Sequence, residues 1–416
     1  MRNNPISRHA PPTAATTTCT NNRLYFSGFA MSLNNVSASS RVHVLGAGAV
    51  GLLIAAHLRH LGHPITLLFR SQASADRFVS NGSRIAVLND WMRSHPTRKL
   101  LLNASSPGSI EPWIASNIQA ELSHTSQTNR DAGDSEKIEQ LLIATKAHDA
   151  VQAYWSVKDR LDSRSTVVLL QNGMGTYEAL LHEFYASHHR NQGKDSEIPS
   201  FVIGTNSHGC LRLPNEQFTT HHTAMAALQF AVRPLLHNPP SSPPRSTLAM
   251  LSTLSSLPLQ VSIVNWSELH LQMLLKLAAN AVINPITALA DCRNGYLVPR
   301  LQEGGGRCVD IGYYESMQSL LSSACAEIAS IYARAHPHLH NELTAQAIEE
   351  YVTHIASATA RNRSSMLQDI STGTQTEIDW INGYMVRLGK QHGVPTPVNT
   401  LLYTLVKLKE AGQHHT

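Results

Sequence analysis

The sequence of 416 residues lacks the features of several common protein classes. Its five cysteines form neither a CxxC pair nor a zinc-finger spacing, which indicates free thiols in a reducing compartment rather than a disulfide framework. The longest apolar stretch, residues 44–56, is too short to cross a bilayer, so we expect no membrane-spanning segment. A net charge of only +4, without a block of Lys or Arg, gives no indication of a nucleic-acid partner.

Acidic residues are absent from the N-terminal segment, since the first Asp or Glu is Asp76. Residues 1–40 combine three arginines with many Ser and Thr and have no long apolar run. This composition favours a mitochondrial transit peptide over a secretory signal, although a disordered extension with no targeting role fits it as well. We therefore expect a cytoplasmic or mitochondrial protein, and we exclude residues 1–40 from the fold.

Metal-site spacings are also absent from the 23 histidines. The pairs His188-His189 and His221-His222 lie in polar stretches that predict loops, and neither pair has the spacing of a zinc site. We therefore expect no bound metal.

The length of the chain predicts two domains, and a hydrophobic content of 42% is typical of a globular protein. Between residues 41 and 266, short apolar runs alternate with helical patterns, which predicts an α/β domain with a parallel sheet. Residues 267–416 show helical periods with no clear strand, and we expect helices around 311–335, 342–360, 376–392 and 399–410. The second domain is therefore expected to be all-α.

A glycine-rich turn follows the first strand of this pattern. Residues 41–45 form the strand, residues 52–62 have a helical pattern, and residues 64–69 form the next strand. Strand, GxGxxG, helix and strand in this order are typical of the Rossmann dinucleotide-binding fold, in which the glycines let the backbone approach a pyrophosphate at the helix N-terminus. The residues expected at the cofactor are Gly46, Gly48, Ala49, Val50 and Gly51.

The residue at the end of the second strand selects the cofactor. An Asp or Glu there binds the ribose hydroxyls of NAD, whereas this chain has Arg70. A guanidinium group suits the 2′-phosphate through charge-assisted, bidentate hydrogen bonds, so we expect NADPH, or NADP+ in its oxidised form. The alternative is a surface arginine that merely follows a strand.

Polar side chains also follow two later strands. Lys146 comes directly after the run 141–145, and Asn172 lies where the run 166–170 gives way to a glycine turn. The carboxyl ends of parallel strands line the ligand crevice of such folds. Lys146 is therefore either a ligand contact or a surface lysine, and Asn172 either hydrogen-bonds the nicotinamide or substrate or caps the turn.

The segment 268–294 carries a polar stripe on an apolar helix. Lys276, Asn280 and Asn284 are spaced four residues apart and share one helix face, while the residues around them are mostly apolar. Buried polar groups are costly without partners, which favours a cleft where a polar ligand supplies them; a partly exposed helix is the alternative. Pro285 is expected to kink or end the helix just after Asn284.

Five motifs, in order along the chain, resemble those of ketopantoate reductase (2-dehydropantoate 2-reductase): GAGAVG, ATKAHD, QNGMG, KLAANAVINPITALADCRNG and SSMLQDI...TEIDWINGY. The resemblance extends from about residue 41 to 407 and is broken by inserts near 104–136, 187–197 and 237–246. It implies a Rossmann domain followed by a helical domain like that of 6-phosphogluconate dehydrogenase, with the active site between them. It also implies NADPH-dependent reduction of ketopantoate to pantoate, a step towards pantothenate and coenzyme A.

The resemblance also implies roles for single residues. The family's catalytic lysine and glutamate fall on Lys276 and Glu377. Substrate binding is implied for Asn172, Lys276, Asn280, Asn284, Asn294 and Ser365. Cofactor binding is implied for the glycine-rich turn and for Arg70, Lys146, Asn172, Gly209 and Glu377.

The chemistry of 2-keto acid reduction agrees with this assignment. Hydride arriving at the keto carbon builds negative charge on its oxygen, and a lysine whose pKa is tuned by burial is a suitable proton donor. Glu377 would orient Lys276 or hold the nicotinamide ribose, although from sequence alone its place beside Ile378 and near Trp380 favours a surface position on a helix. The alternatives are reduction of another 2-keto acid and a non-catalytic NADPH-sensing protein; a homodimer is left open.

Overall fold

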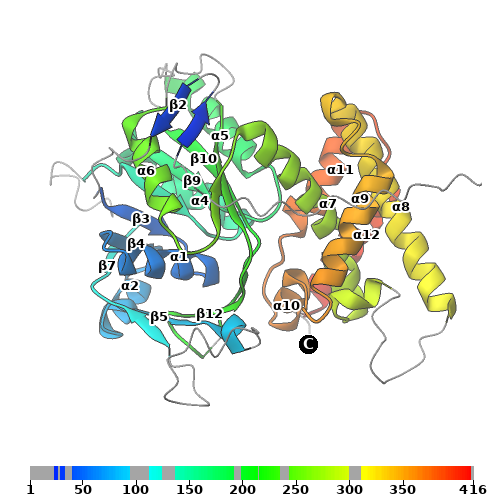
Figure 1. Ribbon diagram of the computed structural model, residues 1–416, viewed down its shortest axis with the longest axis horizontal. Helices are drawn as coiled ribbons and strands as arrows, with labels where there is room; N and C mark the ends of the chain where they lie inside the picture. Colours follow the sequence, from blue (N-terminus) through cyan, green and yellow to red (C-terminus); the bar gives the residue numbers. More distant parts are fainter. Residues whose placement is uncertain are drawn as a thin grey trace, which may run out of the picture.

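Figure 1 shows an α/β domain and a helical domain lying side by side, with helix α7 leading from the first into the second. The fold class predicted from the sequence is confirmed. The computed structural model describes residues 23–26, 29–32, 40–93, 112–123, 136–191, 198–213, 215–234, 243–298 and 311–413.

An eight-stranded sheet forms the centre of the α/β domain, in the order β14-β13-β10-β9-β8-β3-β4-β7. The strands from β10 to β7 run parallel to one another, whereas β13 is antiparallel to β10 and pairs in parallel with β14. The strands are β3 (Val42–Leu45), β4 (Ile65–Phe69), β7 (Gln119–Leu122), β8 (Gln140–Ile143), β9 (Thr166–Leu169), β10 (Ser200–Asn206), β13 (Leu228–Val232) and β14 (Val261–Ile263).

Helices cover both faces of this sheet. α1 (Ala49–His60) and α6 (Arg245–Ser255) share one hydrophobic core with it, and α4 (Ala147–Val157) and α5 (Thr176–Asn191) share a second. α2 (Gln72–Ser80) lies beside β4 and β7. Because the central strands are buried on both sides, they are continuous apolar runs rather than alternating patterns.

Two smaller sheets complete the strands of the described chain. β1 (Arg23–Phe26) and β2 (Phe29–Ser32) form an antiparallel hairpin within the segment 1–40. A four-stranded sheet of order β11-β12-β5-β6 packs against α1. Its strands are β5 (Ile85–Leu88), β6 (Trp113–Ala115), β11 (Gly209–Leu211) and β12 (Thr219–Ala224).

Three local expectations are wrong in this domain. The predicted surface insertion over 104–136 contains β6 and β7, and β7 forms an edge of the main sheet; the rest of that segment lies largely outside the described residues. His188-His189 lie in α5 rather than in a loop. His221 and His222 lie in β12 and are buried, where His221 Nδ1 is 2.8 Å from Asp90 Oδ2 and His222 Nε2 is 2.9 Å from His208 Nδ1. Polar strands of this kind carry no hydrophobic period.

The helical domain has one hydrophobic core, with α7 at its centre. By length and composition α7 would be able to cross a membrane, but 67% of its apolar window is buried inside the protein, as in a core helix. The α-helices are α7 (Trp266–Ala290), α8 (Ile311–Ala335), α9 (Ala345–Ala358), α10 (Ser365–Ser371), α11 (Asn382–Gln391) and α12 (Pro397–Gln413).

The helix predicted over 376–392 is two elements, because the backbone breaks at Ile381 (φ −108°, ψ −91°) between the 3-10 turn η9 (Ile378–Trp380) and α11. The sequence also gives no indication of α10, whose seven residues are too few to show a helical period.

Helix α7 runs on through Pro285, so of the two expected outcomes, a kink or an end after Asn284, the end is wrong. A proline has no N–H for the carbonyl four residues earlier, which here is that of Ala281. The fully buried Asn382 supplies the donor instead: its Nδ2 lies 2.8 Å from the Ala281 oxygen. The same amide donates to Asn399 Oδ1 at 3.0 Å. A hydrogen bond from α11 thus replaces the one that the proline removes.

We expect Asn382→Ala to lower the free energy of unfolding by about 1–3 kcal/mol, because it leaves the Ala281 carbonyl buried without a donor. Chemical denaturation measures this loss. Pro285→Ala restores an N–H at residue 285, so it should stabilise the N382A protein more than it stabilises the wild type. Equal effects in the two backgrounds would show that Asn382 stabilises the helix in another way.

Candidate functional site

The functional residues predicted in the α/β domain follow the carboxyl ends of neighbouring parallel strands. β3 leads into Gly46, β4 into Arg70, β8 into Lys146 and β9 into Asn172. Such ends meet at one edge of the sheet, where ligands bind in open α/β folds. The hydrogen bonds of Lys146 and Asn172 show that this edge faces the helical domain.

The glycine-rich turn is shaped for close approach by a ligand. Gly46 has φ +115°, and a Cβ there would lie 2.6 Å from the carbonyl carbon of Ala144. At Gly51 a Cβ would lie 2.0 Å from the Gly46 oxygen, so only glycine lets α1 pack here. A Cβ at Gly48 would instead meet no described atom within 4 Å.

The N-terminus of α1, where Ala49 and Val50 lie, opens onto the same space. Its N-cap is Gly48, which offers no side-chain hydrogen bond, and no acidic residue lies in the first turn. Uncapped backbone N–H groups at a helix N-terminus favour an anion. The turn therefore fits the pyrophosphate of a dinucleotide.

Two residues that sequence reasoning missed hold this turn from the smaller sheet. Arg212 Nη1 donates to the Ala47 carbonyl at 2.7 Å, and Thr220 Oγ1 donates to the Ala49 carbonyl at 2.8 Å. Gly209 begins β11 and lets it approach β12, since a Cβ there would lie 2.5 Å from Thr223 Oγ1. Only the fold brings these strands, more than 150 residues away along the chain, to the turn.

Arg70 lies at the end of β4 with its side chain 63% exposed. Its Nη1 is 3.1 Å from Asp149 Oδ1 in the first turn of α4. An exposed pair of this kind contributes little to stability.

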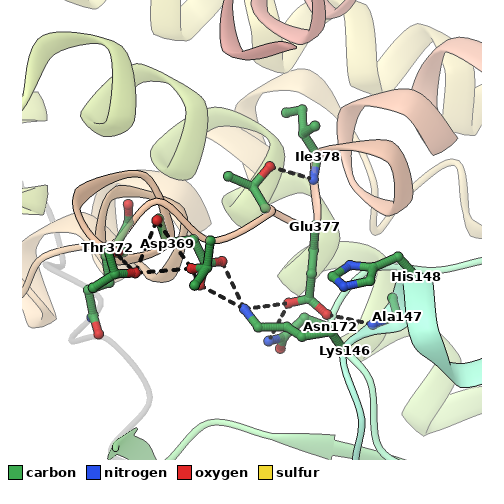
Figure 2. Close-up of polar contacts among 12 residues, drawn as sticks. Lys146, Ala147, His148, Asn172, Asp369, Thr372, Glu377 and Ile378 are labelled. Atoms are coloured by element: carbon green, nitrogen blue, oxygen red, sulfur yellow. Dashed lines mark hydrogen bonds and ion pairs between the residues drawn. The ribbon is translucent and has the colours of Figure 1, made fainter. Parts of the chain in front are cut away.

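Glu377 is 4% exposed, so the surface position that its sequence allows does not hold. Figure 2 shows its carboxylate pointing into the α/β domain, where Oε1 accepts from the Ala147 N–H at 3.0 Å and Oε2 from Asn172 Nδ2 at 3.2 Å. Ala147 is the first residue of α4, and the N-terminus of a helix stabilises a carboxylate. Glu377 therefore joins the helical domain to two strand ends of the sheet.

Lys146 is held from the helical domain as well. Its Nζ donates to both carboxylate oxygens of Asp369, at 2.8 and 3.0 Å, and lies 3.9 Å from Glu377 Oε2. Burial by itself would lower the pKa of Lys146, but the charges of Glu377 and Asp369 and the hydrogen bond to Asp369 together raise it. Lys146 is thus a charged group that pairs with the helical domain at the domain boundary.

The turn after β9 packs directly on the helical domain. Gly173 has φ +80°, and a Cβ there would lie 2.4 Å from the Trp380 carbonyl oxygen. The next residue, Met174, donates its N–H to the same oxygen at 3.0 Å. The glycine is required because the two backbones touch.

Lys276 lies on α7 and is partly buried. Its Nζ donates to the Asn206 carbonyl at 2.5 Å and to Thr205 Oγ1 at 3.2 Å, both at the end of β10. Burial lowers the pKa of Lys276 to about 8, while the charge of Glu377 acts in the opposite direction. Such an ammonium group is still charged at neutral pH but gives up its proton readily.

The other polar residues of the stripe have free side chains. Asn284 is buried and Asn280 is partly buried, and neither side-chain amide hydrogen-bonds to another described residue. Ser365 is the exposed first residue of α10, where its neighbour Ser364 caps the helix. These groups remain available to a ligand.

Asn294 is engaged elsewhere, since its Nδ2 donates to Thr359 Oγ1 at 2.9 Å. Its Oδ1 is buried without a partner. The structure does not bring Asn294 into hydrogen-bond contact with the Lys276 stripe. Among the described residues, no group of His, Cys, Asp or Glu is arranged to hold a metal ion, and Cys210, Cys292 and Cys325 are free.

An open glycine-rich turn on a Rossmann-type sheet, next to a helical domain that carries a lysine of lowered pKa, defines an NAD(P)-dependent oxidoreductase. The family model "Ketopantoate reductase PanE/ApbA" matches residues 42–234, and "Ketopantoate reductase PanE/ApbA C terminal" matches residues 268–410. The chain therefore belongs to the ketopantoate reductase family.

Curated relatives agree with the family models. The chain is similar to the 2-dehydropantoate 2-reductase of Escherichia coli O157:H7, with 30% identity over 65% of this chain and 74% of the relative. It is similar to that of Yersinia pestis, with 30% identity over 72% and 85%. A probable 2-dehydropantoate 2-reductase of Schizosaccharomyces pombe is 26% identical over 89% and 96%.

Solved structures share the fold. A probable 2-dehydropantoate 2-reductase from Bacillus subtilis has a TM-score of 0.59 and 22% identity, covering 89% of this chain and 100% of its own. D-mandelate dehydrogenase with NADH and anilino(oxo)acetate has a TM-score of 0.65 and 16% identity, covering 90% and 99%.

Proposed function

We propose that this protein reduces ketopantoate (2-dehydropantoate) to (R)-pantoate with NADPH, in the synthesis of pantothenate and coenzyme A. The relatives named 2-dehydropantoate 2-reductase support this reaction. The structural observation that carries it is Lys276, a partly buried lysine with a pKa of about 8 on the same helix face as two unpartnered amides.

Lys276 acts as the general acid. When bound, NADPH supplies the hydride that reaches the keto carbon. The Nζ proton of Lys276 then passes to the oxygen on which negative charge develops. Thr205 and the Asn206 carbonyl hold the ammonium group at the end of β10. Asn280, Asn284 and Ser365 bind the substrate's carboxylate and hydroxyl groups.

The residues that would hold the cofactor follow the strand ends at the edge of the sheet. The glycine-rich turn would hold the pyrophosphate, and Arg70 would hold the 2′-phosphate. Glu377 accepts hydrogen bonds from Asn172 and from the first residue of α4, and not from Lys276. We therefore assign Glu377 and Asn172 to the nicotinamide ribose rather than to the orientation of Lys276. Lys146 and the backbone at Gly209 contribute further contacts. Asn172 and Asn294 complete the proposed substrate set.

The test is NADPH oxidation by the purified full-length protein, followed by absorbance. The substrates are ketopantoate, pyruvate and the 2-keto acid that corresponds to D-mandelate, since a D-mandelate dehydrogenase shares the fold. Turnover selective for ketopantoate supports the proposal. Selective turnover of another 2-keto acid would keep the reductase and change its substrate. NADPH binding with no turnover would leave only a sensing role.

A further inference from the structure

We propose that Asp369 is a positioning residue: it holds Lys146 away from Glu377 and so keeps the Glu377 carboxylate in place beside the catalytic site. This inference rests on the proposed function, in which Lys276 is the general acid. Asp369 itself touches neither substrate nor cofactor in this account.

Two carboxylates of the helical domain compete for one lysine of the α/β domain. Figure 2 shows Lys146 between Asp369 and Glu377. The lysine donates to both oxygens of Asp369, at 2.8 and 3.0 Å, whereas Glu377 Oε2 is 3.9 Å away, beyond hydrogen-bond distance. The hydrogen bonds of Lys146 are therefore directed to Asp369.

Asp369 is well fixed by its own element. It lies near the end of α10, and its carbonyl accepts the N–H of Thr374 at 2.9 Å. Its side chain is 15% exposed, whereas that of Lys146 is 40% exposed. The short, partly buried aspartate is thus the anchor, and the long lysine side chain is the part that adjusts.

The arrangement leaves Glu377 free for two other donors. Its Oε1 accepts from the Ala147 N–H and its Oε2 from Asn172. Without the Asp369 charge, Glu377 becomes the nearest carboxylate to Lys146. A shift of about 1 Å in the flexible Lys146 side chain would then form a close ion pair with Glu377. The ammonium group of Lys146 would partly neutralise the negative charge of Glu377.

The change would reach Lys276 through charge. Glu377 is the carboxylate that favours the ammonium form of Lys276 against the effect of burial. If Lys146 neutralises Glu377, the protonated form of Lys276 is less stable and its pKa falls further. The other titratable groups at the start of α4 are Asp149, which pairs with Arg70, and His148, whose Nε2 lies 3.8 Å from Asp149 Oδ2.

The test is the pH profile of kcat for Asp369→Asn at saturating NADPH and substrate. The acid form of Lys276 is lost as the pH rises, so its titration sets the basic limb of the profile. In D369N we expect that limb to move to lower pH by about 0.5–1 unit. Asp369→Glu keeps the charge and should hold the limb at its wild-type position.

A second substitution separates positioning from simple structural damage. Lys146→Met in the D369N background removes the cation that would pair with Glu377, so the limb should move back towards the wild-type pH. Asp162→Asn is the matched control, because Asp162 pairs with Arg164 two residues away and precedes β9, whereas the site residue Asn172 follows that strand. It should leave the limb unmoved.

Two results would overturn the inference: an unmoved limb in D369N, or a shift that persists after Lys146 is also replaced. Both leave the proposed function intact if the wild type shows a basic limb that depends on Lys276. A wild type without that limb would refute the role of Lys276 and this inference with it.

Discussion

Lys276→Ala is expected to lower kcat by about 10²–10⁴-fold, the usual contribution of a general acid, while NADPH still binds. The reason is local: Lys276 bonds to Thr205 and the Asn206 carbonyl, and makes no hydrogen bond to the glycine-rich turn. Steady-state kinetics measure the first effect, and titration of NADPH fluorescence measures the second. Unchanged turnover would remove Lys276 from the chemistry.

Lys409→Ala is the matched control for this substitution. Lys409 also donates to a backbone carbonyl, that of Ala288 at 2.7 Å, but it does so from α12 at the end of α7. Its loss should affect stability and leave kcat near the wild-type value.

The wild type should also lose activity as the pH rises through about 8, because burial lowers the pKa of Lys276 to that value and only the ammonium form donates a proton.

Arg70→Asp is expected to reverse the cofactor preference. A hydrogen bond to a charged group is worth about 1.5–3 kcal/mol, so losing the contact to the 2′-phosphate should lower kcat/KM for NADPH by about 10–100-fold. Repulsion between the new carboxylate and the phosphate adds to this loss, while the ribose hydroxyls of NADH gain an acceptor. The measurement is kcat/KM for both cofactors.

The fold should tolerate this change, because Arg70 is exposed and its ion pair with Asp149 lies at the surface, where such pairs contribute little to stability. Arg77→Asp introduces the same charge on α2, where Arg77 Nη2 donates to the Ser74 hydroxyl at 3.1 Å. It should leave the preference for NADPH unchanged. Equal use of NADPH and NADH by the unmodified protein would contradict the role given to Arg70.

Much of the α/β domain can be predicted from local sequence. The turn at Gly46 lies between a buried strand and an apolar helix, and a GxGxxG turn in that order of elements is typical of dinucleotide binding. The apolar runs of β8 and β9 indicate strands that are covered on both faces. The polar stripe on α7 can also be predicted, since three polar residues spaced four apart stand out against an apolar helix.

The contacts that complete the site are not local. Lys146 and Asp369 are 223 positions apart, and Glu377 and Ala147 are 230 apart. Apart from the motif resemblance, which singles out Glu377, no periodicity distinguishes either acidic residue from a solvated surface carboxylate. Their burial follows only from the packing of the helical domain on the sheet edge, which no helical period or strand run encodes.

Polar strands could not be predicted from the sequence for a related reason. β12 has the sequence TTHHTA, and its buried histidines are stabilised by hydrogen bonds to side chains on other elements. Periodicity detects apolar burial and has no means of detecting a polar side chain that is buried because a partner comes from elsewhere.

The bond from Asn382 to the Ala281 carbonyl has a consequence for how this family can diverge. Proline at 285 is tolerable only while residue 382 presents a donor, and a donor at 382 is needed for this purpose only while residue 285 is proline. The two positions should therefore covary among descendants of this sequence. A lineage that exchanges Pro285 first gains a path to lose Asn382, whereas the reverse order passes through a destabilised intermediate.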